Sequence, residues 1–239
     1  MTPLPPRQPN GLTVLDTFCC SGGMGMGYYL AGYDVVGVDI NPQPHYPFEH
    51  HVADAVQFIR EHGHEFDLIH GSPPCQDFST LNAYNKKSYP RLIAPTREAM
   101  LATGRPYVIE NVEEAARELI DPVTLCGPMF DLRVYRHRVF ETNWTLPVPE
   151  HPKHVARCMR NGYLPTEEKP FMSIHGGRHS RAWQNAACDA MGMPWIKVPA
   201  GGDIPLGIRE VCEAIPPAYA EWIGGRAADH IRAGRLAAA

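Results

Sequence analysis

Residues 12–39 read LTVLDTFCCSGGMGMGYYLAGYDVVGVD and contain a strand, a glycine-rich turn, a helix and a second strand. The apolar run Leu12–Leu15 ends at Asp16, and glycines then lead into the helical segment. Such glycines let a ligand approach the backbone, and the helix N-terminus offers free N–H donors. The second strand, 34–39, ends in Asp39, a position from which a carboxylate commonly binds a ribose. The stretch predicts a nucleotide-binding α/β fold, and the lack of G-x-G-x-x-G directly after the strand argues against a dinucleotide.

The alternation of strand and helix continues along the chain. We expect strands at 66–70 and 106–112, preceded by helices at about 55–62 and 96–102. Strands that alternate with helices indicate a parallel sheet, in which functional residues lie just beyond the carboxyl ends of the strands. The turn 71–76 follows one of these strands, and Glu110 and Asn111 end the next. These two segments are therefore candidates for one site.

Cys75 and Glu110 have the residue types that a nucleophile and a general acid require. Cys75 follows two prolines and precedes polar residues, whereas a buried structural cysteine usually lies inside an apolar run. Glu110 ends a very apolar strand, where desolvation is expected to raise its pKa so that the carboxyl donates a proton near neutral pH. Each residue alone has a structural alternative, a buried thiol or a carboxylate paired with an arginine. Together, beside a nucleotide-type turn, they favour a catalytic site.

Seven segments resemble, in sequence and in order, the motifs of the DNA cytosine-C5 methyltransferases. They are DTFCCSGG at 16–23, VDI at 38–40, ADA at 53–55, PCQDFS at 74–79, ENV at 110–112, RHR at 136–138 and AIPP at 214–217. The fourth is similar to the family's Pro-Cys-Gln-x-Phe-Ser signature, which is highly specific. The resemblance covers about 12–140 and 209–224. It implies the Rossmann-like α/β fold of S-adenosylmethionine-dependent methyltransferases, with a mostly parallel doubly wound sheet and a small target-recognition lobe.

What the resemblance implies about catalysis concerns five residues. In this family a thiolate adds to C6 of a flipped-out cytosine and makes C5 nucleophilic, and Cys75 matches that nucleophile. Glu110 matches the acid that holds N3 and the exocyclic amine, and Asn111 is expected to keep the Cys75 loop in place. Arg138 matches a residue that contacts the base carbonyl, with Arg136 as its electrostatic neighbour. The motifs do not identify the base that later removes the C5 proton.

The implied cofactor is S-adenosylmethionine, and the implied product is S-adenosylhomocysteine. Phe18 is expected to pack against the adenine or the sulfonium, and the turn after it to bind the methionine end. Asp39 is expected to bind the ribose hydroxyls, and Asp54 the adenine amine. The resemblance assigns to the cofactor Phe18, Ser21, Gly22, Gly23, Asp39, Ile40, Asp54, Ala55 and Pro74.

The sequence departs from the family pattern at three places. Cys20 lies where the family usually has glycine, and Asp39 lies where glutamate is more common. Cys212 and Glu213 replace the usual Gly-Asn before the last motif, so an asparagine that would contact the cofactor is missing. These departures concern the details of cofactor binding and leave the expected reaction unchanged.

The region 144–206 is expected to form the small target-recognition lobe. The alternation of strands and helices stops there. Residues 151–200 contain seven Lys or Arg and three Asp or Glu, although the net charge of the chain is −4. This asymmetry favours a polyanion partner, here double-stranded DNA. A small lobe reaches few base edges, so we expect a target of about two to four base pairs. Candidate DNA contacts are Gln76, Ser79, Lys86, Lys87, Arg178 and Arg181, with solvated basic loops as the alternative for the charged ones.

The remaining domain boundaries and the cellular setting are inferred from composition. Residues 1–11 are expected to be a disordered lead-in rather than a signal peptide, 12–143 the catalytic and cofactor-binding domain, and 207–239 a C-terminal helix that returns to it. No apolar run is long enough to span a membrane. The seven cysteines include no C-x-x-C pair, so we expect neither a zinc site nor a disulfide framework, and a reducing, cytoplasmic setting. The expected protein is a monomer without a metal ion.

Three alternatives share parts of this interpretation. The same fold and chemistry serve a tRNA cytosine-C5 methyltransferase, which Cys75 and Glu110 would not distinguish. A catalytically silent DNA-binding relative would keep the lobe, although an intact Cys75 and Glu110 oppose it. Transfer of a group other than methyl, from a modified cofactor, fits the same residues.

Overall fold

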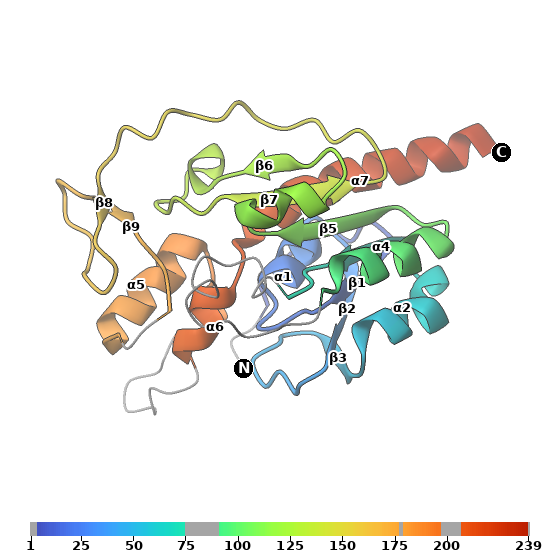
Figure 1. Ribbon diagram of the computed structural model, residues 1–239, viewed down its shortest axis with the longest axis horizontal. Helices are drawn as coiled ribbons and strands as arrows, with labels where there is room; N and C mark the ends of the chain where they lie inside the picture. Colours follow the sequence, from blue (N-terminus) through green and yellow to red (C-terminus); the bar gives the residue numbers. More distant parts are fainter. Residues whose placement is uncertain (1–3, 75–90, 177–178, 197–206, 239) are drawn as a thin grey trace.

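The computed structural model describes residues 4–74, 91–176, 179–196 and 207–238. Within these residues the chain forms a seven-stranded sheet in the order β3-β2-β1-β4-β5-β7-β6 (Figure 1). Strands β1 to β5 are parallel, and β7 runs antiparallel to its neighbours β5 and β6. The strands are β1 (Thr13–Thr17), β2 (Asp34–Asp39), β3 (Glu49–Val52), β4 (Leu68–Gly71), β5 (Tyr107–Asn111), β6 (Val123–Leu125) and β7 (Arg138–Thr142). The predicted mostly parallel α/β fold is confirmed.

Helices cover both faces of this sheet. The helices are α1 (Gly23–Leu30) and α7 (Pro217–Ala238) on one face and α2 (Ala55–His62) and α4 (Ile93–Ala102) on the other, with short turns η1 (Gly63–Glu65), η2 (Glu113–Glu118) and η3 (Gly127–Phe130) between elements. Successive side chains of a strand point to opposite faces. Val14 of β1 therefore joins the core beneath α1 and α7, and Leu15 joins the core beneath α2 and α4. Each face of the sheet thus has its own apolar layer.

Helix α2 shows how local sequence sets the bounds of an element. Asp54 precedes the helix, and its Oδ1 accepts a hydrogen bond from the Gln57 N–H at 2.8 Å. Such a cap satisfies a free donor of the first turn and contributes about 1 kcal/mol. Val56 and Ile59 lie on the buried face of the helix and pack into the core. The predicted range 55–62 is confirmed.

Helix α1 is glycine-rich because two of its glycines lie against the C-terminal segment. A Cβ atom at Gly23 would lie 2.2 Å from Ile215 O, and one at Gly27 would lie 2.1 Å from Pro217 O. Only glycine permits so close an approach of the two backbones. The contact brings the last sequence motif, 214–217, beside the first.

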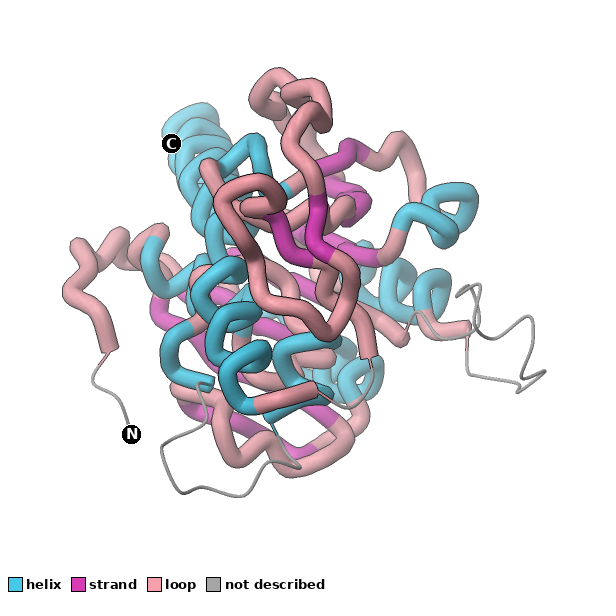
Figure 2. Tube along the Cα trace, turned by 90° about the vertical axis from the view of Figure 1, so that its left-hand side faces the viewer, coloured by secondary structure: helices cyan, strands magenta, loops and turns pink. Residues whose placement is uncertain are grey.

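A small lobe follows the sheet and has its own core. It contains β8 (Cys158–Met159), β9 (Phe171–Met172), α5 (Arg181–Met191), η4 (Pro194–Ile196) and α6 (Gly207–Glu213), on the left in Figure 1 and toward the viewer in Figure 2. Trp183, Met191 and Met193 are fully buried there, in one cluster with Val211 and Ala214. The lobe's core therefore continues past position 206, where the sequence places its end, because α6 packs against α5.

The described part of the lead-in, 4–11, is bound to the sheet rather than disordered as expected. Arg7 donates to Gly32 O at 2.5 Å and pairs with Asp34, and Asn10 Nδ2 donates to Ala31 O at 2.9 Å. Backbone carbonyls at the C-terminus of a helix lack hydrogen-bond donors within the helix. Here the side chains of Arg7 and Asn10 in the lead-in are those donors. Composition alone does not reveal these contacts, since they join segments far apart in the sequence.

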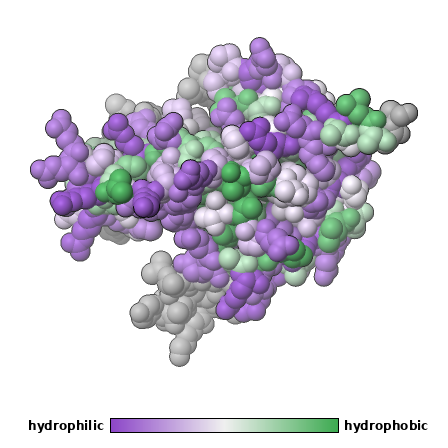
Figure 3. All heavy atoms as spheres, turned by 90° about the horizontal axis from the view of Figure 1, so that it is seen from above, coloured by the Kyte–Doolittle hydropathy of each residue, from purple (hydrophilic) through white to green (hydrophobic). Residues whose placement is uncertain are grey.

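No helix among the described residues is long and apolar enough to cross a membrane. On the face that Figure 3 shows, hydrophilic residues predominate and hydrophobic ones form small groups. Large exposed apolar side chains such as Ile40, Val155 and Tyr163 come from different parts of the chain. Isolated exposed side chains of this kind are ordinary, and of these three Ile40 adjoins the site described next.

Candidate active site

A strained turn joins β1 to α1. Phe18, Cys20 and Gly22 have positive φ angles of 57°, 45° and 84°. Positive φ is uncommon outside glycine, and such strain gathers at functional sites. The angle at Cys20 gives a physical reason why the family that the sequence resembles usually has glycine there. The turn closes through the Gly22 N–H, which donates to Cys19 O at 3.0 Å.

Asp39 ends β2 with its carboxylate beside this turn. Its Oδ2 accepts from the Cys20 N–H at 3.2 Å, and its Oδ1 accepts from the Asn41 N–H at 2.9 Å. A carboxylate has about four acceptor sites, so both oxygens retain capacity for a ligand hydroxyl. The next residue, Ile40, is 64% exposed although it is large and apolar. Both side chains therefore suit contacts with a ligand at this edge of the sheet.

Ser21 is buried in the same turn with an unsatisfied hydroxyl. The residue is 1% exposed, and its Oγ has no hydrogen-bond partner among the residues that the structure describes. An unpaired buried hydroxyl costs about 1–3 kcal/mol, and such a group calls for an explanation such as a ligand. Trp195 of the small lobe donates from Nε1 to the Ser21 carbonyl at 3.1 Å. The turn thus fits a polar ligand and is supported from the lobe.

Glu110 and Arg138 form a buried ion pair where β5 and β7 run side by side. Arg138 Nε lies 3.0 Å from Glu110 Oε1, and Glu110 is 4% exposed. Burial raises the pKa of Glu110, whereas Arg138, a hydrogen bond from Ser72 and the charge of Arg136 oppose the rise. The net direction is upward, so the protonated form is more populated near neutral pH than for an exposed glutamate.

A chain of hydrogen bonds leads from Glu110 into the core. Ser72 bonds to Glu110, and its Oγ lies 2.9 Å from His70 Nε2. His70 Nδ1 lies 3.1 Å from the Tyr28 hydroxyl. Burial lowers the pKa of His70 to about 3, so the neutral ring donates from one nitrogen and accepts at the other. Ser72 is thereby held beside the carboxyl.

Asn111 joins the end of β5 to the segment that follows β4. Its Nδ2 donates to Pro73 O at 3.0 Å, and its Oδ1 accepts from the Val112 N–H at 3.0 Å. Asn111 is 1% exposed, so water does not compete for these bonds. Because Pro73 precedes Cys75 by two positions, the bond fixes the start of the segment that carries the thiol. This contact suits the supporting role that the sequence suggests for Asn111.

Arg136 is buried and connects the sheet to the small lobe. Its Nη1 donates to Ile174 O at 3.3 Å, and its Nη2 donates to Cys212 O at 2.6 Å. The Tyr219 hydroxyl donates to Arg136 O at 2.6 Å. Burial lowers the pKa of the Arg136 guanidinium to about 9. Its hydrogen bonds therefore hold the lobe, while its charge acts on Glu110.

Asp16 is a second buried carboxyl beside the turn. The residue is 1% exposed, and the Tyr46 hydroxyl donates to its Oδ2 at 3.0 Å. Burial raises the pKa of Asp16 to about 8, against the opposing hydrogen bonds from Tyr46 and the Gly25 N–H. In the sequence, Asp16 can be recognised because it follows directly on the first apolar run.

No family model matches the chain. Over 119 residues the chain is 31% identical to the type II methyltransferase M.HgiGI of Herpetosiphon aurantiacus, and the match covers 44% of this chain and 93% of that protein. The chain belongs to the type II methyltransferases. This methyltransferase is also 32% identical over 119 residues to M.HgiDI of the same organism. That match covers 44% of the chain and 38% of M.HgiDI, so the chain corresponds to little more than a third of that relative.

Solved structures share the fold of this methyltransferase. A candidate DNA modification methyltransferase encoded within an E. coli prophage superposes with a TM-score of 0.64 at 14% identity, covering 93% of this chain and 100% of that one. The Entamoeba histolytica methyltransferase EhMeth has a TM-score of 0.60 at 11% identity, covering 95% and 99%. S. pombe Dnmt2 has a TM-score of 0.57 at 14% identity, covering 92% and 99%. The likeness shows the Rossmann-like fold of S-adenosylmethionine-dependent methyltransferases.

The structure gathers the predicted cofactor residues at the carboxyl ends of neighbouring strands. Phe18, Ser21, Gly22 and Gly23 follow β1, Asp39 and Ile40 end or follow β2, Asp54 and Ala55 begin α2, and Pro74 follows β4. Asp54 Oδ1 caps α2, and Oδ2 accepts no hydrogen bond from the described residues, so it is the oxygen with most capacity for a ligand. Parallel pairing of β2, β1 and β4 is what brings these segments together.

Several predicted residues lie outside the described part of the chain. They are Cys75, Gln76, Ser79, Lys86, Lys87 and Arg178. Arg181 is described, and it begins α5 with its side chain partly buried. The sequence did not single out His70, Ser72 or Tyr28, although His70 and Ser72 flank the end of a predicted strand. Trp195 packs against the core of the small lobe, and its partly buried indole also bonds to the turn after β1.

Proposed function

We propose that this methyltransferase transfers a methyl group from S-adenosylmethionine to C5 of cytosine in double-stranded DNA, with Cys75 as the nucleophile. The observation that carries the proposal is the junction of β4 and β5. There the buried carboxyl of Glu110 lies next to the Asn111–Pro73 hydrogen bond, which fixes the approach to Cys75. The names of relatives, a type II methyltransferase and a candidate DNA modification methyltransferase, support DNA as the substrate. The motif resemblance supports cytosine and the covalent route.

The proposed reaction begins at the thiol, because cytosine C5 does not take a methyl group unaided. The Cys75 thiolate forms a bond to C6, and the electrons of the C5–C6 double bond shift toward N3, which takes a proton from Glu110. S-adenosylmethionine, when bound, supplies the methyl group that C5 then takes. A base removes the C5 proton, the bond from sulfur to C6 breaks and releases the Cys75 thiolate, and N3 returns its proton to Glu110.

The Glu110–Arg138 pair suits both protonation states that this sequence of steps requires. Burial raises the pKa of Glu110, so the acid is available to donate to N3. Once the proton has left, the carboxylate lies 3.0 Å from Arg138 Nε and is stabilised by that charge. Ser72 adds a hydrogen bond to the same carboxyl. The site is thus prepared in advance for a charge that develops during the reaction.

The turn after β1 is the proposed cofactor site. Ser21 Oγ, buried and unpaired among the described residues, is a donor for the methionine carboxylate. Asp39 has remaining acceptor capacity for ribose hydroxyls, and exposed Ile40 offers an apolar cover for the adenine. Phe18, in the strained turn, packs against the same ligand in this proposal. The second oxygen of Asp54 accepts from the adenine amine.

DNA is proposed to bind between the small lobe and the segment that carries Cys75. C6 of cytosine is inaccessible inside the base stack, so the target base must leave the duplex. The proposed contacts are Gln76, Ser79, Lys86, Lys87, Arg178 and Arg181, with the two lobe arginines reading bases or holding phosphates. The excess of basic residues in 151–200 supports this placement.

The test is methyl transfer from labelled S-adenosylmethionine to unmethylated duplex DNA, followed by nucleoside analysis. Wild type should place label in 5-methylcytosine, and Cys75→Ser should abolish it. Cys158→Ser is the matched control, since Cys158 is exposed on β8 and should leave the rate unchanged. Label on tRNA and none on DNA would replace the proposed substrate. Label on another base, or equal transfer by Cys75→Ser, would overturn the proposed chemistry.

A further inference from the structure

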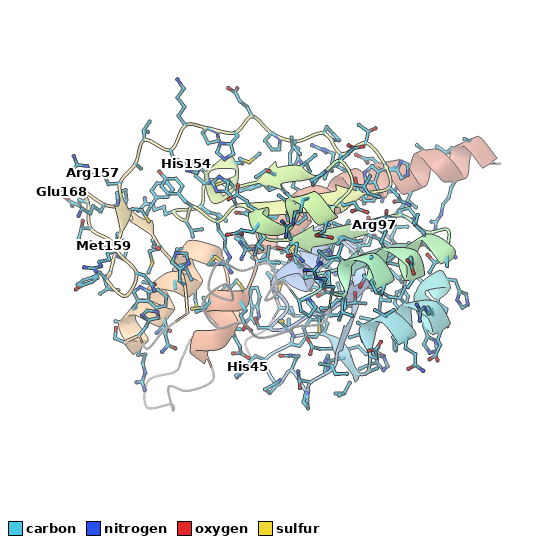
Figure 4. All side chains as sticks on the ribbon, in the orientation of Figure 1. His45, Arg97, His154, Arg157, Met159 and Glu168 are labelled. Atoms are coloured by element: carbon cyan, nitrogen blue, oxygen red, sulfur yellow. The ribbon has the colours of Figure 1, made fainter. Side chains whose placement is uncertain are left out.

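Four metal-ligating side chains converge beside the start of β7. Cys126, His137, His151 and His154 each offer one donor atom, and these atoms all lie within 4.8 Å of one another. Cys126 follows β6 and His137 precedes β7, while both other histidines lie in the segment that leads to the small lobe. In Figure 1 this segment passes over β6 and β7 on its way to β8, and Figure 4 labels His154 on it.

Two distances within this cluster are close to those between ligands of one small ion. Cys126 Sγ lies 3.4 Å from His154 Nε2, and His137 Nε2 lies 3.1 Å from His151 Nε2. Tetrahedral zinc with bonds of about 2.0–2.1 Å to nitrogen and 2.3 Å to sulfur separates its ligand atoms by about 3.3–3.7 Å. Small side-chain adjustments would bring all four donors to that spacing. Two imidazole nitrogens at 3.1 Å share either a proton or a metal ion.

The rings of the cluster are held in place from outside. Glu113 Oε2 lies 3.4 Å from His137 Nδ1, the nitrogen that faces away from the cluster. A carboxylate on the outer nitrogen of a histidine is a common second contact in metal sites, because it orients the ring and fixes its tautomer. Tyr135 stacks on His154 with ring centres 4.0 Å apart, and its hydroxyl donates to Ala156 O at 2.8 Å. The donors are therefore oriented before any ion arrives.

We propose that Cys126, His137, His151 and His154 bind one Zn²⁺ ion in a structural site. One sulfur and three imidazole nitrogens form a donor set that suits zinc and excludes the oxygen-seeking ions Mg²⁺ and Ca²⁺. Four protein ligands fill a tetrahedral shell and leave no open position for catalysis. The absence of C-x-x-C suggested no zinc site in the sequence, since that pattern does not detect donors contributed by separate segments.

The position of the site gives the ion a role in arranging the lobe. His137 lies between Arg136, which bonds to the lobe, and Arg138, which pairs with Glu110. His151 and His154 belong to the chain that enters the lobe from the sheet. An ion bound here ties that chain to the strand end carrying both arginines. Its loss should loosen the lobe while the sheet and its cofactor turn stay intact.

The test is the zinc content of the untagged full chain, purified from zinc-containing medium. Wild type should carry about one zinc per chain, and His151→Gln and His154→Gln should lower this at least fivefold. Both histidines are exposed, so these variants should fold. His64→Gln and Cys158→Ser, exposed residues elsewhere, are the matched controls and should keep the wild-type content.

A second measurement examines the donor set directly. Co²⁺ added to the zinc-free chain should give the strong visible bands of tetrahedral coordination and a thiolate charge-transfer band that Cys126→Ser removes. Chelator should lower the thermal midpoint of wild type and not that of the His151→Gln/His154→Gln double variant. Wild type with under about 0.1 zinc per chain and no such cobalt spectrum would overturn the proposal, as would equal zinc in all variants. These readouts do not depend on methyl transfer, so they stand whatever the catalytic assays give.

Discussion

Asn111 Nδ2 donates to Pro73 O at 3.0 Å and so ties the end of β5 to the segment that carries Cys75. The structure offers a matched residue at the other end of the same strand. Asn143 Oδ1 accepts from the Tyr107 N–H at 2.9 Å, and its Nδ2 donates to Arg105 O at 3.1 Å. Both asparagines bond to backbone beside β5, but only Asn111 touches the approach to the thiol.

We therefore expect Asn111→Ala and Asn143→Ala to differ in activity more than in stability. Asn111→Ala leaves buried backbone groups unpaired and should lower the free energy of unfolding by about 1–3 kcal/mol, whereas Asn143 is exposed and its change should cost less. Asn111→Ala should also lower kcat about 10–100-fold, because a misplaced nucleophile reacts slowly. Urea unfolding and steady-state methyl transfer on both variants measure these effects. Equal kcat for the two would show that the Pro73 contact has no catalytic consequence.

Glu110→Gln should lower kcat about 10²–10⁴-fold, since the amide cannot supply the proton that N3 requires. Glu141→Gln is the control, because Glu141 is also buried and bonds to an arginine, Arg97, at 2.6 Å. Glu141 also accepts from the Tyr107 hydroxyl at 2.9 Å, away from the proposed site. Its change should reduce stability and spare kcat. A similar loss of kcat in both variants would point to a folding effect and remove Glu110 from the mechanism.

The buried Asp16 should make stability depend on pH in a defined direction. Burial raises its pKa from 3.8 to about 8, so the folded state favours the protonated form. The stability that this proton confers is complete below pH 3.8 and is lost as pH rises through about 8. Wild type should therefore lose stability relative to Asp16→Asn between these values, by up to about 1.4 kcal/mol per pH unit. Urea unfolding from pH 5 to pH 8 measures the difference.

Asp131→Asn, at an exposed carboxylate, is the control for that series and should follow the wild-type pH profile. The interpretation fails if the difference between wild type and Asp16→Asn stays constant across the range, because the carboxyl would then titrate alike in the folded and unfolded chains.

Two glycines should respond in opposite ways to alanine. A Cβ at Gly27 would lie 2.1 Å from Pro217 O, so Gly27→Ala must push α1 away from α7 and should cost more than about 2 kcal/mol. A Cβ at Gly225, within α7, meets nothing within 4 Å among the described atoms. Gly225→Ala should stabilise the chain by about 0.4–1 kcal/mol through helix propensity. Thermal unfolding of both variants tests the packing, and a tolerated Gly27→Ala would contradict it.

Sequence patterns predicted the parallel part of the sheet well, because each signal there is local. The apolar run Asp34–Asp39 gives β2 its predicted bounds, and the Asp54 cap does the same for α2. Strand β3 was not predicted, because its sequence, EHHV, has no apolar alternation. Its residues are largely exposed at the edge of the sheet. Strand β7 was not predicted because it begins within the motif 136–138, which was interpreted for its arginines, and because it pairs antiparallel with β5.

The residues of the candidate site also fall into those with a local sequence signal and those without one. Glu110 and Asn111 could be placed from the sequence, since motif and strand end coincide. His70 and Ser72 could not, because their roles arise from contacts with Tyr28 and Glu110 that only the folded sheet creates. The metal-ligating cluster is an extreme case, with donors drawn from three separate segments.

The central claim is that Cys75 forms a covalent bond to C6 of cytosine, and a trapped adduct tests it most directly. Duplex DNA with 5-fluorocytosine blocks the last step, because fluorine at C5 cannot leave as a proton does. Wild type with S-adenosylmethionine should form a protein–DNA complex that survives denaturing electrophoresis, with the modified peptide containing Cys75, and Cys75→Ala should form none. A complex that persists in Cys75→Ala, or active enzyme that methylates cytosine yet never becomes trapped, would contradict the account.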